Sequence, residues 1–144
     1  MTNEDGIRRT LSEYCQLLDD GRFDDWAEIF AVDATFMPLG NVVTGREAIR
    51  AWAYETFPDP DQIGRHLTVN PIVDVFGETA VAKSDVLMLR PSPEGPRPVL
   101  VGEYHDRLVR EDGRWRFARR EVIVRLQEWL APELGATATG PARP

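Results

Sequence analysis

The sequence predicts a single α+β domain in which the helices come first and a sheet follows. Apolar residues recur with the 3.6-residue spacing of α-helices up to about residue 57, and beyond residue 62 the spacing falls to the 2.0 of strands. The chain has 144 residues, the length of one ordinary domain. We therefore expect helices packed on one face of a curved sheet of mixed or antiparallel strands.

The first half of the chain is predicted to contain two longer helices, with a short helix and a short strand between them. A helix from about residue 4 to 19 has one apolar face, formed by Ile7, Leu11, Tyr14, Cys15 and Leu18. The short helix lies around residues 23–30, and a short strand follows over 33–37. Thr44 or Gly45 caps the third helix, which ends before Pro58.

The second half is predicted to form four long strands, over residues 64–75, 78–90, 98–111 and 114–127. Gly77 and the Asp112-Gly113 pair are tight-turn signals, so neighbouring strands are expected to pair as antiparallel hairpins. The domain is expected to span residues 1–131. A flexible tail rich in Gly, Ala, Thr and Pro is expected over residues 132–144.

In the last strand, strict alternation separates aromatic from basic residues. It places Trp115 and Phe117 on the core face, and Arg114, Arg116 and Arg120 on the opposite face. The strand therefore predicts a core of aromatic rings and a surface of salt-bridged arginines.

Composition argues against several classes of protein. The chain has 17 Lys+Arg against 24 Asp+Glu, and the resulting net charge of −7 is unfavourable for binding nucleic acid. No stretch approaches the roughly 20 apolar residues of a membrane helix, and the first residues lack the pattern of a signal peptide. Cys15 is the only cysteine, expected to be buried packing, and no Cys/His cluster has metal-ligand spacing. We expect a cytoplasmic protein with no nucleic-acid partner, no membrane partner and no metal.

Asp19 and His66 are the candidates for acid/base chemistry. On the helical wheel Asp19 flanks the buried face of the first helix, whereas Asp20 points to water. His66 shares one strand face with Thr68 and Asn70, and this face is polar for a core strand. An imidazole transfers protons near neutral pH, and a carboxylate can orient it. The alternatives are an acid bonded to the loop after the helix and a histidine that faces solvent.

Two further candidates depend on orientations that the sequence leaves open. His105 shares a strand face with Glu103 and Arg107, and this face either lines a cavity or faces solvent or a second subunit. Tyr54 lies on the third helix with Trp52 and Phe57, and the three could form the apolar lid of a pocket, although core packing explains Trp52 and Phe57 equally well.

Several motifs together resemble the SnoaL-like family of the nuclear transport factor two-like superfamily. They are Tyr14-x4-Asp19, Trp26-x3-Phe30-x2-Asp33, Gly45-Arg46-Glu47-Ala48-Ile49, Arg65-His66, Gly102-x-Tyr104-x-Asp106-Arg107 and Asp112-Gly113-Arg114-Trp115-x-Phe117-x2-Arg120. The motifs cover roughly residues 5–127. The resemblance implies a cone-shaped α+β barrel, in which a curved sheet wraps around a long first helix and encloses a deep pocket.

The resemblance also implies roles for individual residues. Dehydratases of this superfamily, such as scytalone dehydratase and bile acid 7α-dehydratase, use a His/Asp pair in the cavity, and Asp19 and His66 occupy matching positions. Tyr14 resembles the cavity tyrosine of the bile acid dehydratase group, and His105 is a candidate for the second cavity histidine of scytalone dehydratase-like enzymes. We expect substrate contacts from Tyr14, Tyr54, Tyr104 and His105.

The leading hypothesis is a cofactor-independent lyase or isomerase, in the first place a dehydratase. Its substrate would be a small, largely apolar, oxygenated molecule such as a polyketide, steroid or aromatic intermediate. The alternatives are a SnoaL-type polyketide cyclase and a non-catalytic protein, either a small-ligand-binding module or an accessory subunit. Relatives commonly bury the uncovered face of the sheet between subunits, so a homodimer or homotrimer is expected.

Overall fold

The computed structural model describes residues 1–126, and its elements follow the expected order. The expected tail over residues 132–144 lies outside the described residues. The elements are α1 (Asn3–Asp19), α2 (Phe23–Ala27), β1 (Phe30–Pro38), β2 (Val43–Thr44), α3 (Arg46–Thr56), the 3₁₀ helix η1 (Pro60–Gln62), β3 (Arg65–Phe76), β4 (Thr79–Arg90), β5 (Arg97–Glu111) and β6 (Arg114–Leu126).

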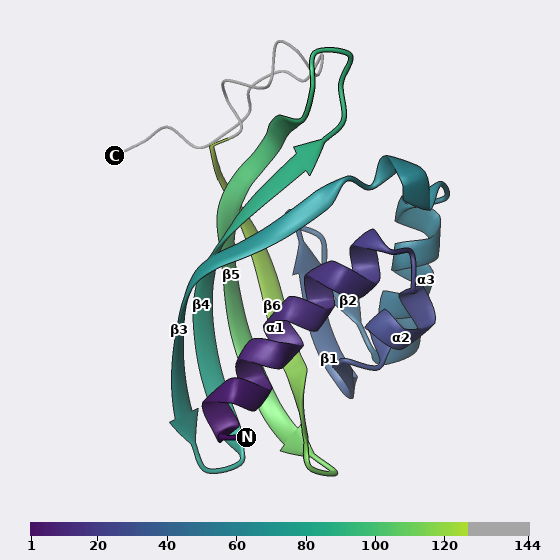
Figure 1. The fold of residues 1–144 in the computed structure, drawn as a ribbon. Helices are drawn as coiled ribbons and strands as arrows, with labels where there is room; N and C mark the ends of the chain where they lie inside the picture. The colour runs from purple at the N-terminus through teal and green to yellow at the C-terminus, as the bar shows by residue number, and fades with distance from the viewer. Residues whose placement is uncertain (127–144) are drawn as a thin grey trace.

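Within residues 1–126, six strands form one mixed sheet that does not close into a complete barrel. Its order is β2-β1-β6-β5-β4-β3; β1 runs parallel to β6, and every other neighbouring pair is antiparallel. Figure 1 shows the sheet curving around α1, while α2 and α3 lie on the side of β1. The predicted fold class, α+β with helices on a curved mixed sheet, is confirmed.

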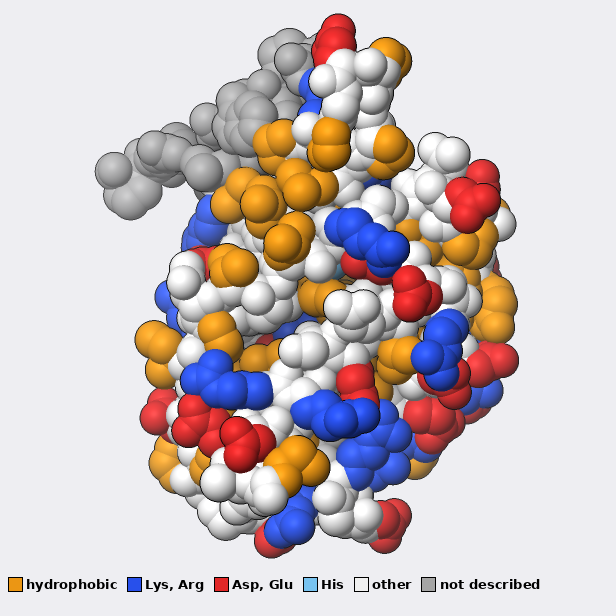
Figure 2. Space-filling view, in the orientation of Figure 1, with side chains coloured by type: hydrophobic (Ala, Val, Ile, Leu, Met, Phe, Trp, Pro, Cys, Tyr) orange, Lys and Arg blue, Asp and Glu red, His pale blue; other side chains and the backbone are white. Residues whose placement is uncertain are grey.

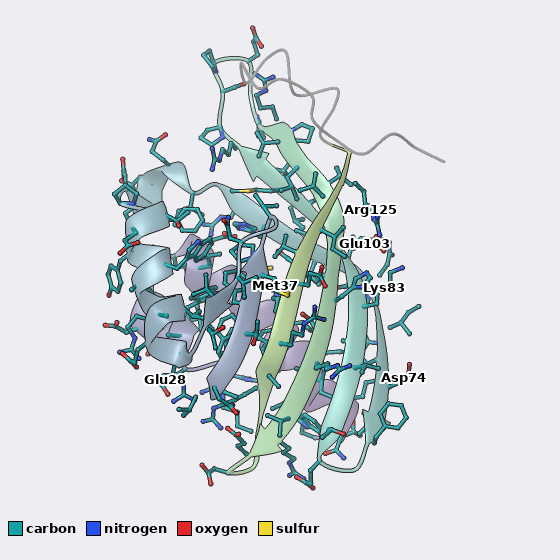
Figure 3. All side chains as sticks on the ribbon, turned by 180° about the vertical axis from the view of Figure 1, so that it is seen from behind. Glu28, Met37, Asp74, Lys83, Glu103 and Arg125 are labelled. Carbon is teal, nitrogen blue, oxygen red and sulfur yellow. The ribbon has the colours of Figure 1, made fainter. Side chains whose placement is uncertain are left out.

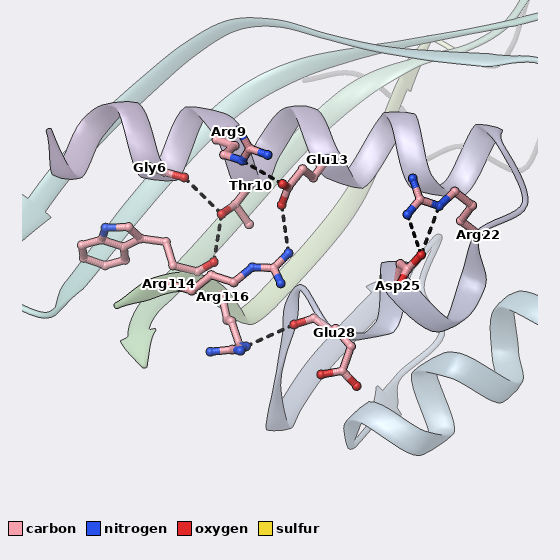
Figure 4. A network of polar contacts seen from close by, with 10 residues as sticks. Gly6, Arg9, Thr10, Glu13, Arg22, Asp25, Glu28, Arg114 and Arg116 are labelled. Carbon is pink, nitrogen blue, oxygen red and sulfur yellow. Dashed lines mark hydrogen bonds and ion pairs between the residues drawn. The ribbon is translucent and has the colours of Figure 1, made fainter. Parts of the chain in front are cut away.

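The sheet wraps around α1, whose start and face are those expected. Thr2 and Asp5 form a capping box at its first turn. The buried residues of α1 are those of the predicted apolar face, together with Thr10. Thr10 Oγ1 donates to the carbonyl oxygen of Trp115 over 2.9 Å, which ties α1 to β6 (Figure 4). This bond is buried and lies near the middle of the helix.

Aromatic rings from α1, α2 and β1 form the centre of the core. Trp26, Phe30 and Phe36 have no exposed surface, and the Trp26 ring lies 4.9 Å from Phe30 and 5.7 Å from Phe36 between centroids. Tyr14 of α1 packs against all three rings. Tilted and edge-on aromatic pairs at these separations add to the stabilisation from burial. The cluster therefore holds α1 firmly against the sheet.

The expected surface position of Arg120 is wrong, because its side chain has no exposed surface. The register between β5 and β6 shifts by one residue between Phe117 and Arg119, which leaves Ala118 as an extra residue in β6. Such a bulge reverses the inward and outward alternation of a strand beyond it. The aromatic residues before the bulge face the core as expected, and Arg120 after it faces the core as well.

Candidate active site

Asp19 and His66 lie side by side and make two contacts. The Nδ1 atom of His66 lies 2.6 Å from Asp19 Oδ1, and the backbone N–H of His66 donates to Asp19 Oδ2 over 2.8 Å. The side chain of Asp19 is 3% exposed and that of His66 is 10% exposed. One carboxylate therefore fixes both the backbone and the ring of the same histidine.

The ends of two elements bring this pair together. Asp19 is the last residue of α1, His66 is the second residue of β3, and α1 packs against β3. Asp20 turns to solvent, with its side chain 50% exposed, and pairs with Arg65 at 3.3 Å. The two acids therefore have the orientations that the helical wheel predicts.

The chain enters β3 through a conformation that favours glycine. Gly64 has a φ of +85°, and a Cβ atom at this position would lie only 2.1 Å from the carbonyl oxygen of Leu89. The close approach of β3 to β4 thus depends on the missing side chain. This close approach fixes the start of β3 and therefore the position of His66, which lies two residues after Gly64.

The contact with Asp19 determines which ring nitrogen of His66 can act as a base. An ionised carboxylate only accepts hydrogen bonds, so the Nδ1 atom carries the proton that it donates to Asp19. The Nε2 atom then presents a lone pair, and no described residue bonds to it. A neutral imidazole held by a carboxylate is suited to general base chemistry.

A second charged pair, which strict strand alternation does not reveal, lies in the interior. Arg120 donates from Nε and Nη2 to the two carboxylate oxygens of Asp106 over 2.8 and 2.9 Å. Its guanidinium carbon lies 4.1 Å from the ring centroid of Tyr14 and 3.8 Å from that of Tyr104. Burial acts to lower the pKa of Arg120, but the charge and hydrogen bonds of Asp106, together with Tyr104 and Tyr14, raise it overall, so the guanidinium stays charged.

Hydrogen-bond donors in this interior are left without a partner. The Nη1 atom of Arg120 and the Nε1 atom of Trp26 are buried, and no described residue accepts from them. Burial raises the pKa of the Tyr14 and Tyr104 phenols, which therefore keep their protons. Donors held away from water are suited to an oxygen atom that gains negative charge during a reaction.

Cys15 and Thr68 extend the contact between α1 and β3. The Sγ atom of Cys15 lies 3.2 Å from Thr68 Oγ1, one helical turn before Asp19 and two residues beyond His66 along β3. Cys15 is 6% exposed, and burial raises the pKa of its thiol. The expected buried position of this cysteine is confirmed.

Of the four expected substrate contacts, the structure places Tyr14 and Tyr104 in the interior, with ring centroids 5.5 Å apart. Tyr54 is half exposed and rests edge-on against Phe23. His105 lies on the outer face of the sheet, because it pairs directly with Lys83 of β4 and its neighbours in the chain face inward. Neither Tyr54 nor His105 is brought together with Asp19 and His66.

No group of three or more His, Cys, Asp or Glu side chains within residues 1–126 is arranged to hold a metal ion. None of the helices described there combines the length and the apolar character needed to cross a bilayer.

A curved sheet wrapped around one long helix, with buried polar groups between them, defines the class of cone-shaped α+β domains. The chain matches the SnoaL-like domain over residues 1–121 and belongs to the SnoaL-like family. It shares its fold with an NTF2-like protein from Novosphingobium aromaticivorans that is 23% identical over 85% of this chain and 81% of its own, with a TM-score of 0.78. The resemblance inferred from the sequence motifs is thereby confirmed. No protein with a curated description matches the chain.

Solved structures with the same fold include three of particular interest. A protein of unknown function from Mycobacterium tuberculosis is 30% identical over 87% of this chain and 73% of its own, with a TM-score of 0.79. A candidate scytalone dehydratase from Novosphingobium aromaticivorans is 25% identical over 85% of this chain and 84% of its own (TM-score 0.71). A protein from Catenulispora acidiphila, solved in complex with S-DNPA, is 26% identical over 84% of this chain and 92% of its own (TM-score 0.74).

Proposed function

We propose that this protein is a cofactor-independent lyase or isomerase, and specifically a dehydratase, in which His66 is the base and Asp19 its orienting partner. The observation that carries the proposal is the double contact of one carboxylate with the backbone N–H and the Nδ1 atom of His66. It leaves Nε2 as the only ring nitrogen able to take a proton. The substrate class is a small, largely apolar, oxygenated molecule, such as a polyketide, steroid or aromatic intermediate.

The proposed elimination can be written with every proton and bond accounted for. The Nε2 atom of His66 takes a proton from a carbon next to a carbonyl group, and the electrons of that C–H bond form the new double bond. The C–O bond to the neighbouring hydroxyl breaks, and the imidazolium returns its proton to the leaving oxygen. Water and the unsaturated product leave, and Asp19 stabilises the imidazolium while it lasts.

The interior donors have a role in this scheme. Negative charge collects on the substrate carbonyl oxygen as the proton leaves, and the phenol of Tyr14 can donate to that oxygen. The Nη1 atom of Arg120, buried and unpartnered among the described residues, adds a charged donor on the same side of the interior. Preorganised donors of this kind lower the barrier because they need no reorientation during the reaction.

Two relatives support the choice of substrate class. The similarity to a candidate scytalone dehydratase favours elimination of water, and the relative in complex with S-DNPA favours a pocket for a small organic molecule. From these we infer that this chain also binds a small, largely hydrophobic ligand. A further structure of similar fold, 19% identical, is the β subunit of a candidate aromatic-ring-hydroxylating dioxygenase, so an accessory role is an alternative outcome of the test.

The test is an assay of hydroxylated polyketide, steroid and aromatic ketones in D₂O, followed by mass spectrometry for loss of water and by NMR for deuterium uptake. We expect His66→Ala to lower the rate by about 10²–10⁴-fold, and Asp19→Asn to lower it as well. Asp20→Asn is the matched control, because Asp20 is the adjacent acid but is half exposed and pairs with Arg65.

The outcomes separate the competing functions. Full turnover in both His66→Ala and Asp19→Asn would contradict the proposal. Loss of activity with Asp19→Asn alone would favour a polyketide cyclase that closes a ring by aldol chemistry. Saturable binding without turnover of any substrate would favour a ligand-binding or accessory protein.

We also propose that the protein is a homodimer or homotrimer that covers the outer face of the sheet. Leu67, Val69, Ile72 and Val81 are exposed on this face, by 39 to 67% of their surfaces. Beside them lies a depression of about 240 Å³. A second subunit that covered this face would remove these apolar side chains from water. Light scattering should give a multiple of the 16.3 kDa chain mass, and a mass equal to one chain would contradict the proposal.

A further inference from the structure

The outer face of the sheet carries charged side chains, several of which pair with a neighbour on the same face. Lys83 lies 2.7 Å from Glu103, and Arg119 lies 3.1 Å from Glu121. Asp85 accepts a hydrogen bond from an asparagine of β3 over 2.9 Å. These charges are therefore satisfied within one copy of the chain.

Asp74 of β3 and Arg107 of β5 are exposed on the same face but have no such partner. Their side chains make no hydrogen bond or ion pair with any residue in the part of the chain that the structure describes. Both line the depression of about 240 Å³ on this face. Figure 3 shows Asp74 on the side of the sheet away from α1. The acid and the base therefore both remain available to a partner outside this chain.

Val81 lies between these two charges in one row across the sheet. It pairs with Asp74 on β3 and with Arg107 on β5, so the three side chains point to the same side. Adjacent strands lie about 4.8 Å apart, which places the acid and the base roughly 10 Å apart with Val81 midway. Val81 is 41% exposed. A row with the order acid, apolar, base is complementary to itself when its direction is reversed.

The outer face is also the side on which two sheets can meet directly. Figure 1 shows α1, α2 and α3 on the opposite side, and Figure 2 shows charged side chains of both signs spread over these helices. A second copy that approached from the helical side would therefore meet helices and their charges rather than the sheet.

A row that is complementary to its own reverse fits a second copy of the same chain. A two-fold axis between two stacked sheets turns one outer face onto the other and, seen face-on, exchanges positions across the axis. Only one such axis brings Asp74 opposite Arg107 of the second copy, namely the perpendicular bisector of the line that joins them. This line runs across the strands, so the axis runs along β4 and passes over Val81.

The same axis brings further side chains together without an unpaired charge. Because it exchanges β3 and β5, Phe76 lies opposite Val109 of the second copy, since both pair with Thr79 in their own sheet. Phe76 is 64% exposed, and the valine on the axis meets its own counterpart. Lys83 also approaches its counterpart, but Glu103 lies 2.7 Å away and neutralises it.

We propose that a second copy of this chain docks on the outer face about a two-fold axis along β4, and that Asp74 of each copy pairs with Arg107 of the other. The inference rests on the proposed homo-oligomer and narrows it to a dimer, since a two-fold axis closes the contact after two copies. The two symmetric ion pairs fix how the sheets are turned relative to each other, and burial of the apolar side chains supplies affinity.

Exchange of the two charges tests this arrangement. Asp74→Arg and Arg107→Glu each place like charges opposite each other, so either single variant should raise the dimer Kd about 10–100-fold in analytical ultracentrifugation over a dilution series. The double variant restores both pairs with reversed signs and should dimerise as wild type does. An equimolar mixture of the two single variants should form a heterodimer, because each of its two contacts again joins an acid to a base.

Arg110→Glu is the matched control. It changes the net charge as Arg107→Glu does, at another exposed arginine of β5, but Arg110 pairs with the core-facing Trp115 and so lies on the other face. It should leave the Kd unchanged. A wild-type dimer whose Kd is unchanged in both single variants, or is not recovered in the double variant, would overturn the proposal. A wild-type trimer would also overturn it while the proposed homo-oligomer stands, whereas a wild-type monomer would contradict the homo-oligomer itself.

Discussion

The guanidinium of Arg120 and the carboxylate of Asp106 form a bidentate ion pair in which neither side chain is exposed to solvent. Burial raises the pKa of Asp106, and the charge of Arg120 opposes that rise. Among the described residues, Arg120 is the only charged partner of Asp106, and Asp106 is the only charged partner of Arg120. The pair is therefore a structural unit as well as part of the proposed site, and loss of either partner leaves a buried charge alone.

Arg120→Met should lower the free energy of unfolding by about 3–5 kcal/mol, because Asp106 is then buried without a counter-charge. Urea unfolding measures the loss. Arg110→Met, at an exposed arginine, should cost no more than about 1 kcal/mol. The double variant Arg120→Met with Asp106→Leu should recover part of the loss, and a double variant less stable than both single variants would contradict this account.

Asp19→Asn should change the protonation pattern of the His66 ring. In wild type the carboxylate holds the proton on Nδ1, whereas an asparagine side chain can donate as well as accept and no longer enforces one tautomer. Long-range ¹H–¹⁵N NMR spectra distinguish the two ring nitrogens. In the neutral ring, wild type should show a protonated Nδ1 and a bare Nε2, and Asp20→Asn should give the same spectrum. A bare Nδ1 in wild type would contradict the assignment of the base.

Glu103 on the outer face makes stability depend on acid pH. Figure 3 shows it between Lys83 and Arg125, and hydrogen bonds from these two residues lower its pKa from 4.5 to about 2. A carboxylate with a lowered pKa stabilises the fold above its unfolded pKa, and the contribution is lost as the pH falls through the folded value. Stability should therefore fall between about pH 4.5 and 2.

The Glu103→Gln variant tests this pH dependence. Its stability deficit relative to wild type should be largest near neutral pH and should shrink as the pH approaches about 2, because glutamine does not titrate. Chemical unfolding at a series of pH values measures the deficit. Glu94→Gln, in the loop between β4 and β5, should give no pH-dependent difference. A deficit in Glu103→Gln that stays constant with pH would show that its charge is not responsible.

Gly102 marks a place where β5 and β6 approach closely. A Cβ atom there would lie 2.1 Å from the carbonyl oxygen of Ile123, so Gly102→Ala should cost about 1–3 kcal/mol of stability through overpacking. Gly77→Ala, in the open turn between β3 and β4, should cost only about 1 kcal/mol, since only its positive φ opposes a side chain. Equal thermal shifts in the two variants would contradict the close-approach argument.

The parts of the molecule that follow one unbroken period were predictable from the sequence. The apolar face of α1 follows the 3.6-residue helical period, which also turned Asp19 inward and Asp20 outward. The four long strands follow a period of two. That period separates two faces but does not say which of them is buried, so the orientation of His105 stayed open until the burial of its neighbours decided it.

Arg120 could not be predicted for a different reason. Its orientation depends on an extra residue in β6, and a bulge leaves no mark in a pattern of apolar and polar residues when the residue concerned is a small alanine. The contact between Asp19 and His66 is also a long-range tertiary contact, since it joins the end of one helix to the start of a strand 47 residues away. Motif resemblance suggested the pair, but periodicity alone supplied only the two orientations.

Because Ala118 is an extra residue in β6, the fold should be unusually sensitive to a deletion at this position. Loss of that one codon would restore strict alternation in β6, turn Arg120 toward the outer face and bring its neighbours in the chain inward, although no other amino acid would have changed. Substitutions of residue 118 should be tolerated far better than a change in the number of residues in β6. The polar interior of this domain therefore depends on the number of residues in β6 as much as on their identity.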